Sequence, residues 1–231
     1  MEGAVTATGS EHTGSRMTLD REERSVKDGI LRMGSLVEQQ IRDAVQAVVH
    51  RDPDLAERVI AGDVRINDAQ REIAEMILTT IATQSPVARD LRFLMALDHV
   101  AFELERIGDH ASGVAKQARK LSGEKPLAPV ADLVRMGELA ADQVRGIITA
   151  LIHVDDEAAR SVAGRDDEID HDYRKVFADV VELMRRDPRT VERGTRLILA
   201  AHWVERIGDR VTNVAEDVVY LATGRVEDLN P

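Results

Sequence analysis

The chain has 231 residues, of which 43% are hydrophobic and 32% charged, and its formal net charge is -11. This apolar fraction is too high for a disordered chain, and no apolar run approaches the roughly eighteen residues of a membrane span, so we expect a cytoplasmic protein without direct membrane insertion. The acidic balance argues against nucleic acid as a partner, and the absence of cysteine leaves only oxygen and imidazole as metal ligands.

Residues 1–17 are expected to form a disordered N-terminal tail. Most of them are Gly, Ser, Thr and Ala with scattered charge, and the segment lacks the apolar stretch of a secretory signal. Beyond the tail, apolar residues recur at spacings of three and four, which is the period of a helix that buries one face. Two such stripes are predicted to be buried: Val59, Ile66, Ile73 and Ile77, and Val204, Ile207, Val211, Val214 and Val218.

Prolines divide this helical pattern into segments. Asp52-Pro53, Ser85-Pro86 and Asp187-Pro188 each place a good N-cap residue before proline at the first helical position. Six helices are predicted, at roughly 20–50, 54–82, 86–122, 128–153, 156–185 and 188–223. Because the connections are short, consecutive helices should be antiparallel. The predicted fold class is therefore all-α, with six long antiparallel helices.

The second half of the chain repeats the first. The segment ELERIGDHASGVAK from Glu103 recurs as WVERIGDRVTNVAE from Trp203, and AGDVRIND from Ala61 recurs as GRDDEIDH from Gly164. Such self-similarity indicates a duplicated structural unit. We therefore expect two pseudo-symmetric three-helix bundles, one formed by residues 18–122 and the other by residues 123–231.

The duplicated core is the string Glu-Arg-Ile-Gly-Asp, at 105–109 and 205–209. Its two acids lie four residues apart and repel each other on a helix, and its glycine costs about 1 kcal/mol relative to alanine. A cation between the carboxylates would reverse that repulsion. The arginine of the string supports the alternative, since it can neutralise an acid by ordinary surface pairing.

The second helix of each predicted bundle carries a similar pair of oxygen donors. These are Asp63 and Asn67 in the first half, and Asp166 and Asp170 in the second. Hard oxygen ligands, with at most His202 added, suit Mg²⁺, Mn²⁺, Fe or Ca²⁺ better than Zn²⁺. From spacing alone, a surface metal site and a merely solvated acidic face both stay open.

These motifs resemble those of the PhoU family, the accessory proteins of bacterial phosphate transport systems. The resemblance rests on the doubled ERIGD, on SPVARDLR from Ser85 to Arg92 and on ILRMGSLVE from Ile30 to Glu38, and it extends from about Thr18 to Gly224. It implies two three-helix bundles and, as in some members, multinuclear iron or another metal held by E(D)xxxD motifs.

Carried over by position, the resemblance implies two divalent or trivalent metal sites, with Fe, Mn, Mg, Ca or Zn as the candidate ions. The first would use Asp63, Asn67, Glu105 and Asp109, and the second Asp166, Asp170, Glu205 and Asp209. The sequence departs from the family pattern at Asn67, which replaces an acid, and at Gly113, where the second half has Asn213.

The resemblance also implies a regulatory role. Family members repress the phosphate-starvation response by coupling the ATPase subunit of the phosphate transporter to a sensor histidine kinase, and they often form homodimers. A non-enzymatic protein is expected, since the sequence contains neither a nucleophile motif nor a Gly-rich phosphate loop.

Two alternatives to a metal-binding regulator are a metal-free helical adaptor and a ferritin-like di-iron enzyme. The enzyme would need Glu-x-x-His on two helices and a further Glu on each of two others, all facing inward. In the helical region the sequence offers this motif once, from Glu168 to His171, on the side away from the stripe that contains Ile169.

Overall fold

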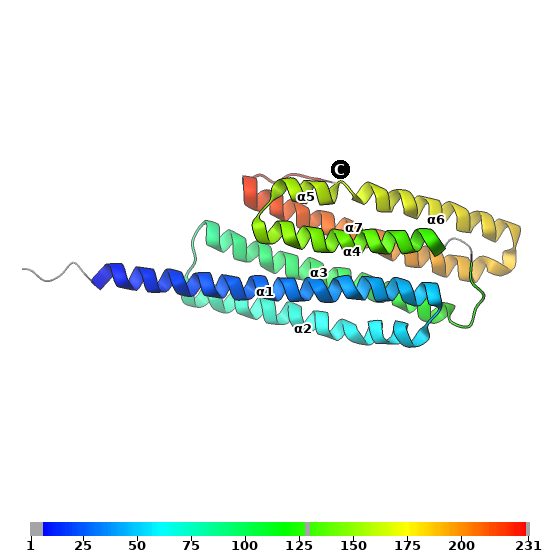
Figure 1. Ribbon diagram of the computed structural model, residues 1–231, viewed down its shortest axis with the longest axis horizontal. Coiled ribbons are helices and arrows are strands. Elements are labelled where there is room, and N and C mark those ends of the chain that lie inside the picture. Colours follow the sequence, from blue (N-terminus) through cyan, green and yellow to red (C-terminus); the bar gives the residue numbers. More distant parts are fainter. Residues whose placement is uncertain (1–6, 128–129, 230–231) are drawn as a thin grey trace, which may run out of the picture.

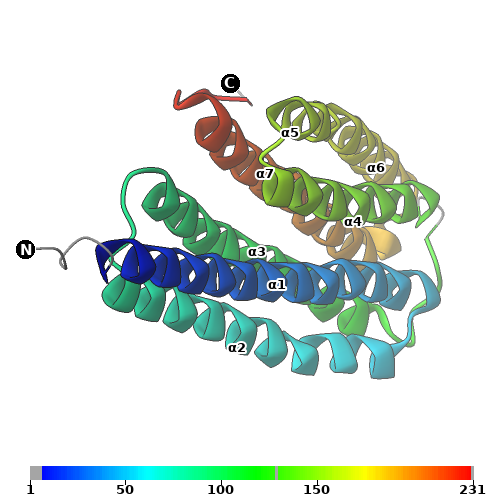
Figure 2. The same cartoon turned by 60° about the vertical axis from the view of Figure 1, so that its left-hand side comes forward.

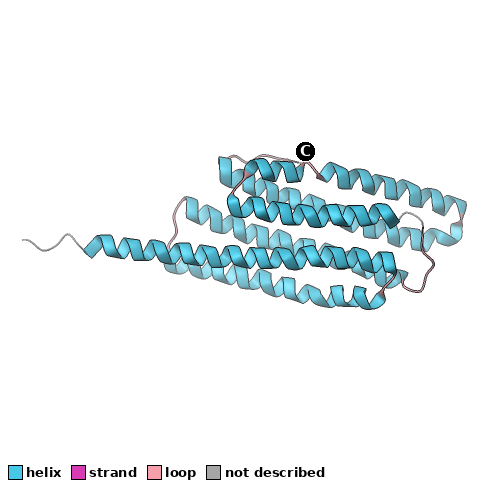
Figure 3. Ribbon diagram, viewed as in Figure 1, coloured by secondary structure: helices cyan, strands magenta, loops and turns pink. Residues whose placement is uncertain are grey.

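The computed structural model describes residues 7–127 and 130–229, and within them the chain is all-α, without a strand (Figure 1, Figure 3). The predicted fold class is therefore confirmed. The helices are α1 Ala7–His50, α2 Pro53–Gln84, α3 Arg89–Leu121, α4 Val130–His153, α5 Asp156–Ala163, α6 Asp166–Arg186 and α7 Val191–Thr223, with a short 3₁₀ helix, η1 Pro188–Thr190. None of these helices is both long and apolar enough to cross a bilayer.

Helices α1, α3, α4 and α7 form the centre of the molecule (Figure 1, Figure 2). Helix α2 packs on α1 and α3, and α6 packs on α4 and α7, so each half has the same arrangement. Helix α3 also runs along α7, and α1 along α4. The two halves of the duplicated sequence therefore meet along two helix pairs.

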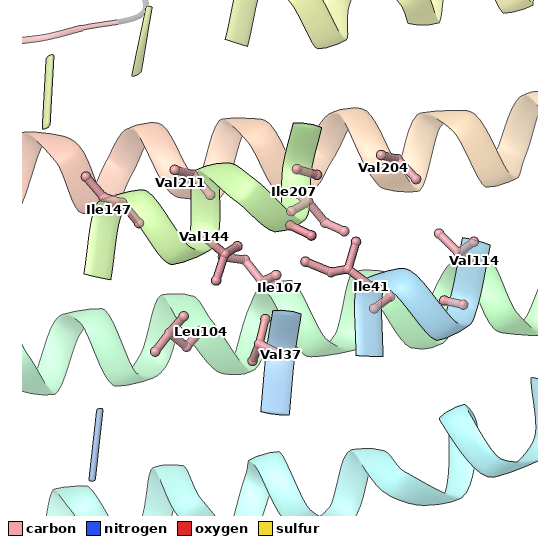
Figure 4. Packing of buried hydrophobic residues seen from close by; sticks show 14 of the residues in the cluster. Val37, Ile41, Leu104, Ile107, Val114, Val144, Ile147, Val204, Ile207 and Val211 are labelled. Atoms are coloured by element: carbon pink, nitrogen blue, oxygen red, sulfur yellow. The ribbon is translucent and has the colours of Figure 1, made fainter. Parts of the chain in front are cut away.

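The buried apolar side chains form one cluster that includes residues of both halves. Both stripes predicted from spacing are buried, including Val59 of α2 and Val204 of α7. Figure 4 shows where the central helices meet in this core, at Val37, Ile41, Leu104, Ile107, Val114, Val144, Ile147, Val204, Ile207 and Val211. The shared core fixes the two ERIGD strings, on α3 and α7, relative to each other.

Several helix boundaries differ from the prediction. Helix α1 begins at Ala7 rather than near residue 20, so it includes most of the predicted tail; residues 1–6 lie outside the described part. The predicted helix 156–185 is interrupted between α5 and α6. There the Gly164 N–H bonds the carbonyls of Arg160 and Val162 and closes α5.

The three Asp-Pro or Ser-Pro pairs behave differently from one another. Asp52 caps α2, because its Oδ1 accepts a hydrogen bond from the Leu55 N–H at 2.9 Å. Ser85 does not cap α3; with φ 48° it lies in the left-handed region, and its N–H bonds the Ile81 carbonyl at 3.1 Å. It therefore ends α2, and α3 begins only at Arg89. Asp187-Pro188 starts η1 instead of α7.

Candidate metal centres

The first acidic set lies between α2 and α3. Asp63 Oδ1 accepts hydrogen bonds from the Ser112 hydroxyl at 3.1 Å and from Gln40 Nε2 at 3.3 Å. Burial raises the pKa of Glu105, and the charges of Asp109 and Asp63 raise it further. Three of the four residues assigned to the first site therefore lie within one another's electrostatic field.

Asn67, the fourth member, lies four residues beyond Asp63 on α2. Its Oδ1 is buried and has no hydrogen-bond partner among the described residues. A buried carbonyl oxygen without a partner is unfavourable, and coordination to a cation would satisfy it. Asn67 thus keeps a side-chain oxygen at the fourth position of the candidate site.

The second acidic set lies between α6 and α7. Asp166 is only 7% exposed, and its pKa is raised to about 7, first by burial and then by the charges of Asp170, Asp209 and Glu205. Burial and Asp209 also raise the pKa of Glu205. All four residues assigned to the second site therefore interact, and their mutual repulsion is what a bound cation would offset.

The glycine of the ERIGD string lets the neighbouring helix approach. A Cβ on Gly208 would lie 2.0 Å from Asp166 Oδ1, which is closer than any non-bonded contact. In the first half, a Cβ on Gly108 would lie 3.0 Å from Ile66 Cδ1. The helical cost of glycine that the sequence analysis noted therefore has a packing reason in both halves, and at Gly208 it makes room for a carboxylate of the candidate site.

The side chains do not converge into a coordination shell. Across residues 7–127 and 130–229, no three His, Asp or Glu side chains are placed to hold an ion together. Asp170 lies 3.7 Å from Arg174, and His202 Nδ1 lies 3.2 Å from Glu205 Oε2. The candidate residues offer the hard oxygen donors that suit a cation, including the buried Asn67 Oδ1 that has no partner among the described residues. In the structure, however, Asp170 and Glu205 contact Arg174 and His202.

Two glutamines that were not predicted from the sequence lie at corresponding positions of the two halves, and Gln40 also contacts Asp63 of the first acidic set. Gln40 Nε2 donates to the Val59 carbonyl at 3.3 Å, and Gln143 Nε2 donates to the Val162 carbonyl at 3.4 Å. Both side chains are buried. The donors, Gln40 and Gln143, are 103 positions apart, and so are the acceptors, Val59 and Val162. This is the offset between the repeated segments at Ala61 and Gly164, so the duplication could have identified the two glutamines.

The di-iron alternative finds no support in the side-chain directions. Glu168 and His171 of α6 are both exposed, whereas Ile169 between them is buried. A ferritin-like centre needs its Glu-x-x-His motif to face the bundle interior. His50 and His153 are the last residues of α1 and α4, where the helix dipole favours a cation.

Comparisons with known proteins agree with one another. The family profile described as the PhoU domain matches residues 30–118 and 133–218. A "Phosphate-specific transport system accessory protein PhoU homolog" of Clostridium acetobutylicum is 35% identical over 217 residues, covering 94% of this chain and 99% of that protein. The homolog of Pseudomonas aeruginosa is 37% identical over 205 residues, covering 88% and 84%.

Two solved structures are similar in fold. The crystal structure of PhoU from Pseudomonas aeruginosa superposes with a TM-score of 0.84 at 36% identity, covering 89% of this chain and 99% of that chain. The phosphate transport system regulatory protein PhoU from Streptococcus pneumoniae gives 0.85 at 28% identity, covering 91% and 99%. In both cases the similarity includes both halves of the molecule.

Proposed function

The chain belongs to the PhoU family, and we propose that it is a non-enzymatic accessory regulator of a phosphate transport system. The observation that carries this proposal is the match of the family profile to each half of the chain, at 30–118 and 133–218. The relatives are named as accessory proteins of a phosphate-specific transport system. Their alignments cover most of this chain and of each relative, which supports the same role for this chain.

In this role the chain would repress the phosphate-starvation response when phosphate is plentiful. It would act in the cytoplasm, as a homodimer, by contacting the ATPase subunit of the phosphate transporter and a sensor histidine kinase. These partners follow from the resemblance to the family, and both lie at the cytoplasmic face of a membrane. A metal-free version of the same adaptor is the competing hypothesis.

Deletion of the gene tests the regulatory role. In phosphate-replete cells, we expect the deletion to raise the expression of a phosphate-starvation reporter, and reintroduction of the intact gene to restore repression. Reporter activity that stays at the repressed level after deletion would overturn the proposal. Co-purification with the transporter ATPase subunit, measured in the same strain, tests the partner separately.

Metal binding is the second part of the proposal. Asp166, Asp170, Glu205 and Asp209 would hold ions between α6 and α7, and the first acidic set would do so between α2 and α3. A bound cation supplies positive charge that offsets the repulsion among these carboxylates. To bind it, Asp170 would rotate away from Arg174, and Asn67 would use its buried Oδ1.

Metal analysis of protein purified without chelators tests this part. We expect the double variant Glu205→Ala/Asp209→Ala to lose about half of the bound metal, because one of two sites is removed. Asp68→Ala/Glu72→Ala, which removes an exposed acid pair of the same spacing on α2, is the matched control and should retain the metal. Equal metal content in both variants, or metal-free parent protein, would favour the adaptor hypothesis.

A further inference from the structure

The contact between α3 and α7 has two sides that correspond by the duplication but differ in chemistry. On one side, Glu103 of α3 is 5% exposed and lies 3.5 Å from Arg210 of α7. Asn213 donates to the same carboxylate at 3.4 Å. Farther along, His99 Nδ1 lies 2.6 Å from Asp217 Oδ2. This side is closed by polar pairs.

On the corresponding side, the partners are aromatic. Residues 103 and 110 of α3 correspond to 203 and 210 of α7, so Trp203 takes the place of Glu103 and His110 that of Arg210. The rings of His110 and Trp203 have centroids 5.2 Å apart. The indole fits because a Cβ on Gly113 would lie 2.8 Å from Trp203 Cδ2. The departure from the family pattern at Gly113 is therefore an accommodation of Trp203.

This replacement leaves polar atoms of α3 unsatisfied. His110 and Gln117 are each 7% exposed, and their Nε2 and Oε1 atoms have no hydrogen-bond partner in the described part of the chain. Both side chains line a cavity of about 380 Å³, which also borders Trp203. That volume lies within the roughly 300–1,000 Å³ typical of small-molecule sites. We call this cavity the seam pocket; its lining is Arg106, Asp109, His110, Gly113, Lys116, Gln117, Lys120 and Trp203.

The seam pocket is cationic in an acidic protein. Arg106, Lys116 and Lys120 line it, against Asp109 as the acidic member. Among the described residues these three cations have no carboxylate within 4.0 Å, whereas Arg119 of the same helix pairs with Glu57 at 3.0 Å. What distinguishes Arg106, Lys116 and Lys120 is that they line the same pocket, where their charges are available to an anion.

His110 adds a hydrogen-bonding group to the same pocket. Its Nε2 atom is buried without a partner among the described residues, and an imidazole nitrogen can carry an N–H and donate it to a bound anion. An anion placed beside it would gain this hydrogen bond and the attraction of the surrounding cations.

We propose that the seam pocket binds the phosphate group of a small anion, supplied either as inorganic phosphate or as a nucleotide. Lys116, Lys120 and Arg106 provide the charge, and the His110 imidazole donates a hydrogen bond. Rotation of the Gln117 amide presents a second N–H donor. Asp109 belongs both to this lining and to the first acidic set, while the other lining residues lie outside the candidate metal sites, so we expect the anion to bind without added metal.

Trp203 gives a direct readout, because it is the only tryptophan of the chain and borders the pocket. Metal-free protein is titrated with inorganic phosphate while the fluorescence of Trp203 is recorded, and with ATP by calorimetry. Sodium chloride at matched ionic strength and sodium sulfate are run in parallel. We expect saturable binding of at least one phosphate compound, and weaker binding of sulfate; the stronger of the two compounds identifies the source.

Two double variants assign the binding to the pocket. Lys116→Ala/Lys120→Ala changes exposed side chains and should weaken binding at least tenfold. Arg185→Ala/Arg186→Ala removes two exposed cations at the end of α6 and should leave binding unchanged. Equal weakening in both variants, equal affinity for sulfate, binding that requires added Mn²⁺, or no saturable binding of either compound would each overturn the proposal.

Discussion

Asp166 Oδ1 occupies the position that a side chain on residue 208 would need, 2.0 Å from the Cβ that Gly208 lacks. Asp166 is the first residue of α6, directly after the interruption at Gly164 and Arg165. The helix break, the buried carboxylate and the motif glycine are therefore parts of one packing arrangement between α6 and α7.

Replacing Gly208 by alanine should destabilise the protein, although alanine is the better helix former. The methyl group would gain about 1 kcal/mol in helix propensity. Displacing the buried Asp166 carboxylate should cost more, for a net loss of about 1–3 kcal/mol. Urea unfolding measures the difference. Gly62→Ala on α2 is the control; its Cβ would have no neighbour within 4 Å, so it should stabilise. Two variants of equal stability would contradict the expectation.

The raised pKa of Asp166 predicts a pH dependence of stability. The unfolded chain releases this proton near pH 3.9 and the native chain near pH 7. Between these values the native state holds more protons, so the free energy of unfolding falls as pH rises. Asp166→Asn removes this effect, and from pH 5 to pH 8 it should gain about 1–2.5 kcal/mol relative to the parent.

Urea unfolding of metal-free protein at pH 5 and pH 8 measures the relative gain. Asparagine also changes hydrogen bonds, but this contribution to the free energy of unfolding is the same at both pH values and cancels in their difference. Asp167→Asn, the exposed neighbour on α6, is the matched control and should show a much smaller change. A difference between Asp166→Asn and the parent that is the same at both pH values would refute the expectation.

Some features were accessible from the sequence because they depend on local spacing. The stripe from Val204 to Val218 needs only the helical period, and every member is buried. Gly164 was missed, since a glycine inside a helix costs only about 1 kcal/mol and packing decides whether the helix breaks. Ser85 was misassigned, because serine is a typical N-cap residue but here takes the left-handed conformation that ends α2.

Some features of the candidate sites could likewise be predicted from local spacing, and others depend on how the helices pack. The acid pairs follow from four-residue spacing, and their partners from the duplication. The contact between His110 and Trp203 could not be predicted, because it depends on the register at which α3 and α7 cross, which no local pattern contains. The burial of Asp172 is of the same kind, since it depends on how α6 lies against α4.

Asp172 of α6 is completely buried and pairs with Arg135 of α4. Arg135→Ala would leave the carboxylate buried without its cation and should lower the free energy of unfolding, although by less than the loss of a fully buried pair because the arginine is half-exposed. Urea unfolding measures this loss. Arg174→Ala, an exposed arginine of α6, is the control, and an equal effect would show that the Asp172 pair contributes nothing special.

The ion pair of His99 with Asp217 should stabilise the protein only where the histidine is protonated. The hydrogen bond to Asp217 is the main cause of the raised pKa of His99, with the charges of Asp217 and Glu103 adding to it. A raised native pKa means that the stabilisation is fully present below the unfolded value of about 6.5 and is lost as pH rises through the native value. Asp217→Asn should therefore cost about 0.5–1 kcal/mol at pH 5.5, since His99 is half-exposed, and much less at pH 9. Thermal unfolding at both pH values measures the cost, with Glu216→Gln on the same helix as control. A loss of equal size at pH 5.5 and pH 9 would mean that Asp217 acts through packing and not through the charge of His99.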